Sequence, residues 1–236
     1  MITIDFNRLV LGDGDRVLDI GCGTGRHACA VHARKKGFVV AADLQLKDLI
    51  EARNQLRFHD QTGHRHGGRW DVGAADITCL PFPDKCFDLV ICSEVLEHVF
   101  DDHKALGELA RVLKKGRQLA VSVPRFFPEK VCWKLSDEYR RTPGGHIRIY
   151  RQEKLIQMLK DAGLTPGRHH FAHSLHTPYW WLKCLVGPNK VHVTVVNLYH
   201  RFLTWEIMKG PPIIRFIDWL FNPILGKSLV IYACKR

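Results

Sequence analysis

The stretch LDIGCGTG, residues 18–25, decides the fold. It continues the apolar run RVLDI, and Gly21, Gly23 and Gly25 are typical of a tight turn between a strand and a helix. Such a turn lets a ligand approach the backbone, with the N-terminal amides of the next helix facing it. A dinucleotide-binding turn, GxGxxG, would end on glycine at the position where this chain has Arg26.

Asp19 stands just before these glycines and indicates the charge of the ligand. A carboxylate roughly 5 Å from a pyrophosphate would cost about 3 kcal/mol per charge pair at an effective dielectric constant near 20. The turn therefore favours a ligand with positive character over a dinucleotide.

Short apolar runs alternate with helical patterns along the first half of the chain. Strands are predicted at 16–20, 38–42, 70–75, 87–93 and 118–123, and helices near 25–36, 46–57 and 102–114. This alternation requires crossover connections, so the sequence predicts an α/β fold with a mainly parallel sheet and helices on both faces. In such sheets the ligand lies at the carboxyl ends of the strands.

LDIGCGTG resembles the glycine-rich first motif of the class I S-adenosylmethionine-dependent methyltransferases, whose cofactor carries an ammonium and a sulfonium. Three later segments are similar to other parts of that family's site. Asp43, closing FVVAAD, resembles the acid that binds the ribose hydroxyls, and Asp76 with Ile77 in AADITCLPFPDKCFD resembles the pair that brackets the adenine. In ICSEVLEHV, Ser93 and Glu94 would border the methionine end.

The resemblance covers residues 16–124 and implies a Rossmann-like, mainly parallel seven-stranded sheet whose last strand is antiparallel. It implies S-adenosylmethionine as the cofactor. The implied cofactor-binding residues are Asp19, Gly21, Cys22, Gly23, Gly25, Asp43, Leu44, Asp76, Ile77, Ser93 and Glu94. Each has a structural alternative, such as a helix cap for Asp43 or a turn former for Asp76.

The second half of the chain completes the sheet and adds to it. SLVIYACKR (228–236) suits the family's reversed strand, and RHHFAHSL (168–175) the strand before it. We expect a single methyltransferase domain, 1–236, with a substrate-side insertion at 125–150 and a helical aromatic insertion or lid at 176–227. The general fold requires neither insertion, so both bear on the substrate.

Two histidines are candidates for a general base. Gly144 and Gly145 allow His146 an irregular backbone position, and the resemblance points His98 toward the substrate. Histidine has the unperturbed pKa closest to working pH, and a hydroxyl acceptor must lose its proton. Plain packing or backbone capping remains the alternative for each.

The predicted helical insertion, 176–227, contains an unusual run of adjacent aromatic residues. Tyr179, Trp180 and Trp181 are adjacent, and a helix in PPIIRFIDWLFNPILGK would have one polar stripe on a broad apolar surface, ending at Pro223. Core packing, a lid over an apolar substrate and contact with a membrane interface stay open. The expected substrate-binding residues are Tyr139, Arg148, Tyr150, His169, His173, Tyr179, Trp180 and Trp181.

No metal is expected from the two histidine-rich segments. His59, His64 and His66 lack cysteine partners or HExxH spacing, and so do His169, His170, His173 and His176. If residues 168–175 form a strand, His169 and His173 share one face, while His170 and His176 share the other.

Composition and charge limit the cellular locations and partners that the sequence suggests. The net charge is +11 with 46% apolar residues, and residues 165–236 carry nine basic and two acidic side chains. Eight cysteines without a CxxC pair, no secretion signal and no apolar run of spanning length favour a cytoplasmic protein, with contact to the inner membrane face left open.

The sequence favours methyl transfer to a hydroxyl, or an activated carbon, of a small lipophilic acceptor such as a quinone, isoprenoid, lipid or glycolipid. The alternative is a tRNA or rRNA methyltransferase, supported by the basic charge and by base stacking on Trp180 or Trp181. No separate RNA-binding module is visible, and CSEV stands where such enzymes have an NPPY-like motif. A non-catalytic scaffold is a third reading. The oligomeric state is left open.

Overall fold

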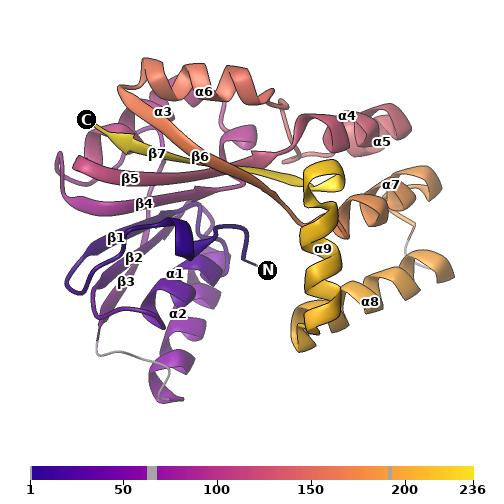
Figure 1. Cartoon of the computed structure of the whole chain (residues 1–236), viewed down its shortest axis with the longest axis horizontal. Coiled ribbons are helices and arrows are strands. Elements are labelled where there is room, and N and C mark those ends of the chain that lie inside the picture. The colour runs from indigo at the N-terminus through magenta and orange to yellow at the C-terminus, as the bar shows by residue number, and fades with distance from the viewer. Residues whose placement is uncertain (1, 63–67, 191–192) are drawn as a thin grey trace.

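The chain folds around one twisted sheet flanked by helices, with a further group of helices beyond one end of the strands (Figure 1). The computed structural model describes residues 2–62, 68–190 and 193–236. His64 and His66 lie outside the described residues. The strands are β1 (Arg16–Ile20), β2 (Phe38–Asp43), β3 (Arg69–Ala74), β4 (Phe87–Ser93), β5 (Leu113–Pro124), β6 (Leu164–Ala172) and β7 (Ser228–Lys235).

The strand order is β3-β2-β1-β4-β5-β7-β6, and β7 runs antiparallel to both β5 and β6. The other pairs are parallel. The predicted Rossmann-like sheet of seven strands with a reversed last strand is therefore confirmed. The helices are α1 (Arg26–His32), α2 (Leu46–Gln61), α3 (Asp102–Val112), α4 (Phe126–Leu135), α5 (Asp137–Arg140), α6 (Gln152–Asp161), α7 (His176–Val186), α8 (Thr194–Lys209) and α9 (Pro212–Leu225), with short 3-10 turns η1 (Phe6–Arg8) and η2 (Leu96–His98).

Side chains that point alternately to the two faces of the sheet form two hydrophobic cores. Leu18 of β1 belongs to the core that includes Leu106 of α3, whereas its neighbour Val17 belongs to the core that includes Leu56 of α2. Side chains of a strand point alternately to opposite faces, so each face needs its own helical layer. Figure 1 shows α3 and α6 on one side of the sheet and α1 and α2 on the other.

The sixth strand differs from the prediction. It was expected at 168–175, but β6 begins at Leu164 and ends at Ala172. His173 has φ 67, a left-handed conformation that breaks the extended chain. The expected separation of His173 and His176 onto opposite faces is consequently wrong, because their ring centroids lie 5.6 Å apart.

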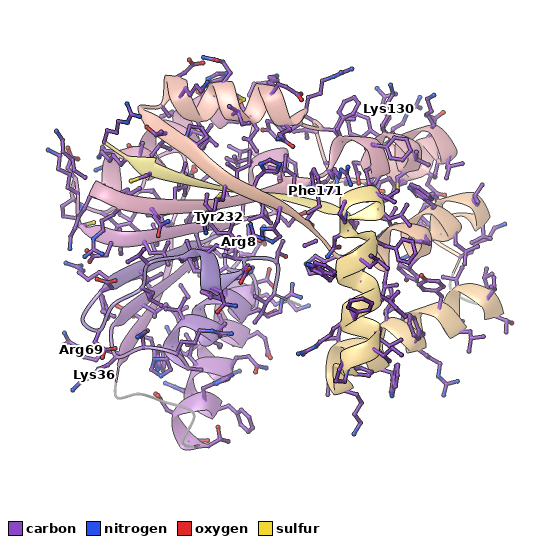
Figure 2. The ribbon with its side chains drawn as sticks, viewed as in Figure 1. Arg8, Lys36, Arg69, Lys130, Phe171 and Tyr232 are labelled. Carbon is purple, nitrogen blue, oxygen red and sulfur yellow. The ribbon has the colours of Figure 1, made fainter. Side chains whose placement is uncertain are left out.

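Three helices, α7, α8 and α9, stand between β6 and β7 in the chain. Tyr179 of α7 packs with Val196 and Leu203 of α8 in a small cluster of its own. At α9, Phe171 lies where β6 meets the helix (Figure 2), with the Arg125 guanidinium carbon 3.7 Å from its ring centroid. Arg125 also donates to the Ile224 carbonyl at 3.1 Å, which fastens the end of α9 to the sheet.

Helix α9 turns its polar stripe inward. The Asp218 carboxylate accepts from the Ser174 hydroxyl at 2.9 Å and from the Leu175 amide at 3.1 Å, and the Asn222 amide oxygen accepts from the Ser174 amide at 2.9 Å. No residue of α9 is buried. Its exposed face, called the α9 apolar face below, consists of Ile213, Phe216, Trp219, Leu220, Phe221 and Ile224, between 42% and 68% exposed.

Pro223 was predicted to end this helix, but α9 continues to Leu225. The ring sits in the last turn, where its missing N–H forfeits a single helical bond, and the Gly226 amide still donates to the Asn222 carbonyl at 2.9 Å. Among the described residues, no helix is long and apolar enough to cross a membrane.

Candidate active site

The glycine turn after β1 makes close contacts at Gly21 and Gly25 that leave no space for a side chain at either position. Gly21 has φ 67, and a Cβ there would lie 2.2 Å from Cγ2 of Val95. Gly25 has φ 82, and its Cβ would lie 2.9 Å from that of Ala52. The turn therefore reaches both α2 and the segment after β4 only because these two residues are glycine.

The acid at the end of β2 is held against this turn. The Asp43 carboxylate accepts from the Gly23 amide and from the Gln45 amide, both at 2.9 Å. The Cys22 amide donates to the Ala42 carbonyl at 3.0 Å, which joins the two strand ends. These bonds orient Asp43 at the carboxyl edge of the sheet, where ligands of open α/β sheets bind.

A cavity of about 420 Å³ lies at this edge. Of the expected cofactor residues it is lined by Gly21, Asp43, Leu44, Ile77 and Glu94. His98 and Gly144 also line it. The cavity thus joins the ends of β1, β2 and β4 to the histidine proposed as a base.

The other expected cofactor residues support the cavity or flank it. Asp19 is 1% exposed, and its carboxylate accepts from the Ala28 amide at 2.9 Å, so it anchors the first turn of α1. Burial raises the pKa of Asp19 to about 7. Asp76 is exposed, and its carboxylate accepts from the Thr78 amide and hydroxyl, each at 2.8 Å.

Glu94 carries backbone strain at the end of β4. Its φ is 58, uncommon for a residue with a Cβ, and its amide donates to the Ser122 carbonyl at 2.9 Å. Its carboxylate accepts from the Ser122 hydroxyl at 2.9 Å, and the Ser93 and Ser122 hydroxyl oxygens lie 2.8 Å apart. The neighbouring strand thus holds Glu94 in a conformation that turns the chain into η2.

The two candidate bases, His98 and His146, lie next to each other. The ring centroids of His98 and His146 lie 5.1 Å apart. The insertion that carries His146 docks on η2, because the Ile147 amide donates to the Glu97 carbonyl at 3.0 Å and His98 Nδ1 lies 3.2 Å from the Gly145 carbonyl oxygen. Burial lowers the pKa of His98, which keeps its imidazole neutral and able to accept a proton.

A buried carboxylate orients His146. Glu129 of α4 is 1% exposed, and its Oε1 lies 2.7 Å from His146 Nδ1. Burial alone would raise the pKa of Glu129, but hydrogen bonding and the charge of His146 hold that pKa below its usual value. Glu129 therefore accepts, and the imidazole presents Nε2 as its second nitrogen.

Aromatic contacts connect this histidine to α7. The Tyr139 ring lies 6.4 Å from that of His146 and 5.7 Å from that of Trp180. Lys227, next to β7, places its Nζ 5.3 Å from the Trp180 ring centroid. Trp181 donates to the Pro128 carbonyl at 3.0 Å. The helical insertion thus reaches the residues beside His146.

Two of the expected substrate residues serve the fold instead. Tyr150 is 1% exposed, and its hydroxyl donates to the Leu96 carbonyl at 3.1 Å and to Asp102 at 2.6 Å. Arg148 donates to the Phe100 carbonyl at 2.7 Å and pairs with Asp102. Both side chains hold residues 148–150 against η2 and α3, so neither belongs to the proposed acceptor site.

His169 and His173 lie elsewhere. They line a separate cavity of about 690 Å³ between the N-terminal segment, β6 and α9. His173 Nε2 lies 3.1 Å from the Thr3 hydroxyl, and burial holds the pKa of His173 well below its usual value. The structure brings neither of them beside His98.

Sequence reasoning missed Glu97 and Glu129, which are 0% and 1% exposed. The available signal for Glu97 was its place in SEVLEHV, after the apolar Val95 and Leu96 and directly before a candidate base. Glu129 had no comparable signal, because its contact with His146 depends on how the insertion folds.

The chain is similar to known methyltransferases. Residues 18–121 match the family model described as a methyltransferase domain. Over 173 residues the chain is 29% identical to 27-O-demethylrifamycin SV methyltransferase of Amycolatopsis mediterranei (strain S699), which covers 73% of this chain and 62% of that protein. Over 121 residues it is 40% identical to the ubiquinone/menaquinone biosynthesis C-methyltransferase UbiE of Vibrio vulnificus, covering 49% and 44%. The chain thus spans only part of the length of these curated relatives.

Among solved structures, the [4+2]-cyclase SpnF matches with a TM-score of 0.63 at 22% identity, covering 98% of this chain and 77% of that one. At this identity the likeness concerns the fold alone. Because that fold carries a cyclase there, the reaction of the present chain must be argued from its own site.

Proposed function

Because this chain carries a class I S-adenosylmethionine-dependent methyltransferase domain, we propose that it transfers a methyl group to a hydroxyl, or an activated carbon, of a small lipophilic acceptor. The observation that carries the proposal is the pair His98 and His146, which meets beside the cavity lined by Gly21, Asp43 and Glu94. The acceptor classes that fit are quinones, isoprenoids, lipids and glycolipids.

The cavity suits S-adenosylmethionine, which supplies a methyl group activated by its sulfonium when bound. A Cβ on Gly23 would meet no atom within 4 Å, so the backbone of the turn is open to a ligand there. We assign Asp43 and Leu44 to the ribose side, Ile77 with Asp76 to the adenine, and Glu94 with Ser93 to the methionine end. Asp19, Cys22 and Gly25 shape the turn.

In the proposed reaction, the histidine pair accepts the proton that the acceptor hydroxyl loses. A hydroxyl is a poor nucleophile until its proton is removed, and a positioned imidazole contributes about 10²–10⁴-fold to such a step. Nδ1 of His98 faces the Gly145 carbonyl and Nδ1 of His146 faces Glu129, so Nε2 of each ring is left for the acceptor. Glu129 and Gly145 fix the orientation of the rings.

The aromatic contacts favour an apolar acceptor. Tyr139 and Trp180 continue from His146 toward α7, and aromatic side chains supply large apolar surfaces with few polar demands. We assign Tyr139, Tyr179, Trp180 and Trp181 to the wall of the acceptor site. The names of the two relatives, one acting on a rifamycin precursor and one in quinone biosynthesis, point toward the same kind of molecule.

The α9 apolar face supports contact with a lipid surface. The polar stripe of this helix is used internally by Ser174 and Leu175, so its apolar residues are left exposed, with Trp219 and Leu220 at the edge of the 690 Å³ cavity. A contiguous exposed apolar patch of this kind marks an interaction site, and an amphipathic helix with nearby cations suits the bilayer interface. We propose peripheral attachment to the inner membrane face, where a lipophilic acceptor would dissolve.

The test is methyl transfer from methyl-labelled S-adenosylmethionine to a cell extract that is then separated into lipid, RNA and aqueous fractions. We expect the label in the lipid fraction with the wild-type protein and little label with His146→Ala. Label confined to RNA would refute the proposal and favour the RNA methyltransferase alternative. Label confined to the aqueous fraction would refute the lipophilic acceptor.

A further inference from the structure

Three side chains at the edge of the cofactor cavity form a cluster with the composition of a metal site. Glu97, His98 and His146 can each offer one ligand atom, and these atoms lie within 4.8 Å of one another. His98 Nε2 and Glu97 Oε1 lie 3.9 Å apart, too far for a hydrogen bond. Residues of η2 and of the 125–150 insertion therefore converge on one point.

Glu97 is the independent sign that something binds there. Its side chain is 0% exposed, and neither carboxylate oxygen has a hydrogen-bond partner among the described residues. Burying a polar group without a partner costs several kcal/mol, more for a charged one, so buried carboxylates are normally paired or coordinate metals.

The histidines are oriented as metal-ligating histidines are. A carbonyl oxygen can only accept, so His98 Nδ1 carries the proton it donates to Gly145 at 3.2 Å. His146 Nδ1 likewise donates to Glu129 at 2.7 Å. Metal-binding histidines typically donate their other ring N–H to a carbonyl or a carboxylate, which leaves a lone pair for the ion.

We propose that Glu97, His98 and His146 bind one divalent transition-metal ion of the zinc type, with Glu129 and the Gly145 carbonyl positioning the two imidazoles. Two imidazoles and one carboxylate are the donor set of catalytic zinc sites, which keep a fourth position open. Ligand atoms about 2.0–2.1 Å from a tetrahedral ion lie roughly 3.3 Å from each other, so the ligand atoms need to approach one another by about 0.5–1.5 Å.

The local charge favours a cation. Glu94, Glu129 and Lys227 act electrostatically on Glu97. Three carboxyl groups, those of Glu94, Glu97 and Glu129, thus lie near a single ammonium group, so the surroundings of the cluster are richer in acidic than in basic side chains. The Nζ atom of Lys227 lies 5.3 Å from the centroid of the Trp180 ring.

This inference rests on the proposed methyl transfer and specifies how the histidine pair serves it. With the ion bound, the two imidazoles would be ligands rather than proton acceptors, and the ion would lower the pKa of an acceptor hydroxyl at its open position. The O–H bond would then break with the proton passing to water, and the oxygen would take the methyl group as the bond from that methyl to the cofactor sulfur breaks. Such a role selects acceptors with an oxygen that can bind the ion, such as a phenol or a hydroquinone, over acceptors without one.

Metal binding is tested on the full-length protein after treatment with EDTA. Zn²⁺ titration by calorimetry, and Co²⁺ titration followed by visible absorption, should give one ion per chain. Glu97→Gln and His146→Ala should each weaken binding by about 10-fold or more, and Glu129→Gln by about 10–100-fold, the range known for partners of ligating histidines. The exposed His103→Ala on α3 is the matched control and should bind as the wild type does.

Folding is checked in the same experiment. Because Glu97 has no hydrogen-bond partner among the described residues, Glu97→Gln should melt at or above the wild-type temperature in EDTA, yet lose the rise in melting temperature that Zn²⁺ gives the wild type. Zn²⁺ binding of equal affinity in wild type, Glu97→Gln and His146→Ala would overturn the inference, as would no binding to the wild type. Titration of S-adenosylmethionine binding in EDTA tests the proposed function independently of the metal site. A protein that binds the cofactor but no ion would leave the proposed function intact.

Discussion

The imidazole rings of His98 and His146 lie 5.1 Å apart although they come from different elements, η2 and the loop after α5. The bond from the Ile147 amide to the Glu97 carbonyl holds the loop in place. The two proposed bases thus meet where the segment after β4 contacts residues 125–150. Substitution of His146 should affect turnover with little effect on the cofactor cavity, whereas His98 also lines that cavity.

We expect His98→Ala and His146→Ala each to lower turnover by about 10²-fold or more, because both remove a nitrogen placed for the acceptor's proton. Affinity for S-adenosylmethionine, measured by calorimetry, should fall much less for His146→Ala, which does not line the cavity, than for Gly21 substitutions. His103→Ala is the control. Near-normal turnover in either variant would remove that histidine from the proposed mechanism.

Gly21→Ala should damage the protein more than Gly23→Ala. Both positions have positive φ, 67 and 51, so each substitution costs about 1–2 kcal/mol of backbone strain. At Gly21 the new methyl group also meets three atoms of the stiff Val95 side chain within 3.3 Å, which adds about 1–3 kcal/mol. Urea unfolding measures the difference. Equal losses would contradict the contact, and Val95→Ala should restore part of the stability of Gly21→Ala.

Asp19 should make the protein less stable as pH rises. Its folded pKa of about 7 lies above the ordinary value near 4, so between these pH values the folded state binds more protons than the unfolded state. This contribution to stability is complete below about pH 4 and is lost by about pH 7. Asp19→Asn should therefore gain stability relative to wild type by roughly 2–3 kcal/mol between pH 5 and pH 8. The exposed Asp71→Asn is the control, and parallel pH curves for Asp19→Asn and wild type would contradict the prediction.

Local motifs carried most of the fold and the cofactor side of the site. Gly21, Asp43 and Ile77 stand at or just after the ends of three strands, and parallel strands bring their carboxyl ends to one edge, so chain order alone predicts that these residues meet. The contacts of Tyr150 and Glu129 could not be predicted in this way. Whether a side chain in an insertion faces the core or a ligand depends on how the insertion docks, which no periodicity reports.

Helix α9 shows a second limit of sequence patterns. The spacing of Asp218 and Asn222 predicts a narrow polar stripe correctly, but a pattern does not say which face of a helix points inward. Burial of the apolar face is the usual outcome. Here Ser174 and the backbone of Leu175 offer polar partners at the end of β6, and these decide the orientation.

The outward α9 apolar face should bind vesicles. Phe216 and Leu220 are 57% and 51% exposed, and they lie one turn apart on that face, so Phe216→Ser/Leu220→Ser removes apolar surface without disturbing a core. At about 1 kcal/mol for each partly inserted side chain, the double variant should bind anionic vesicles about 10-fold or more weakly in flotation. Ile50→Ser/Phe58→Ser on α2, 63% and 59% exposed in the wild type, is the matched control and should float normally. Equal loss in both double variants would mean that exposed apolar surface binds lipid non-specifically, and no loss in the α9 variant would assign that face to another partner. Retained turnover on a water-soluble acceptor analogue would show that the helix delivers the acceptor rather than building the site.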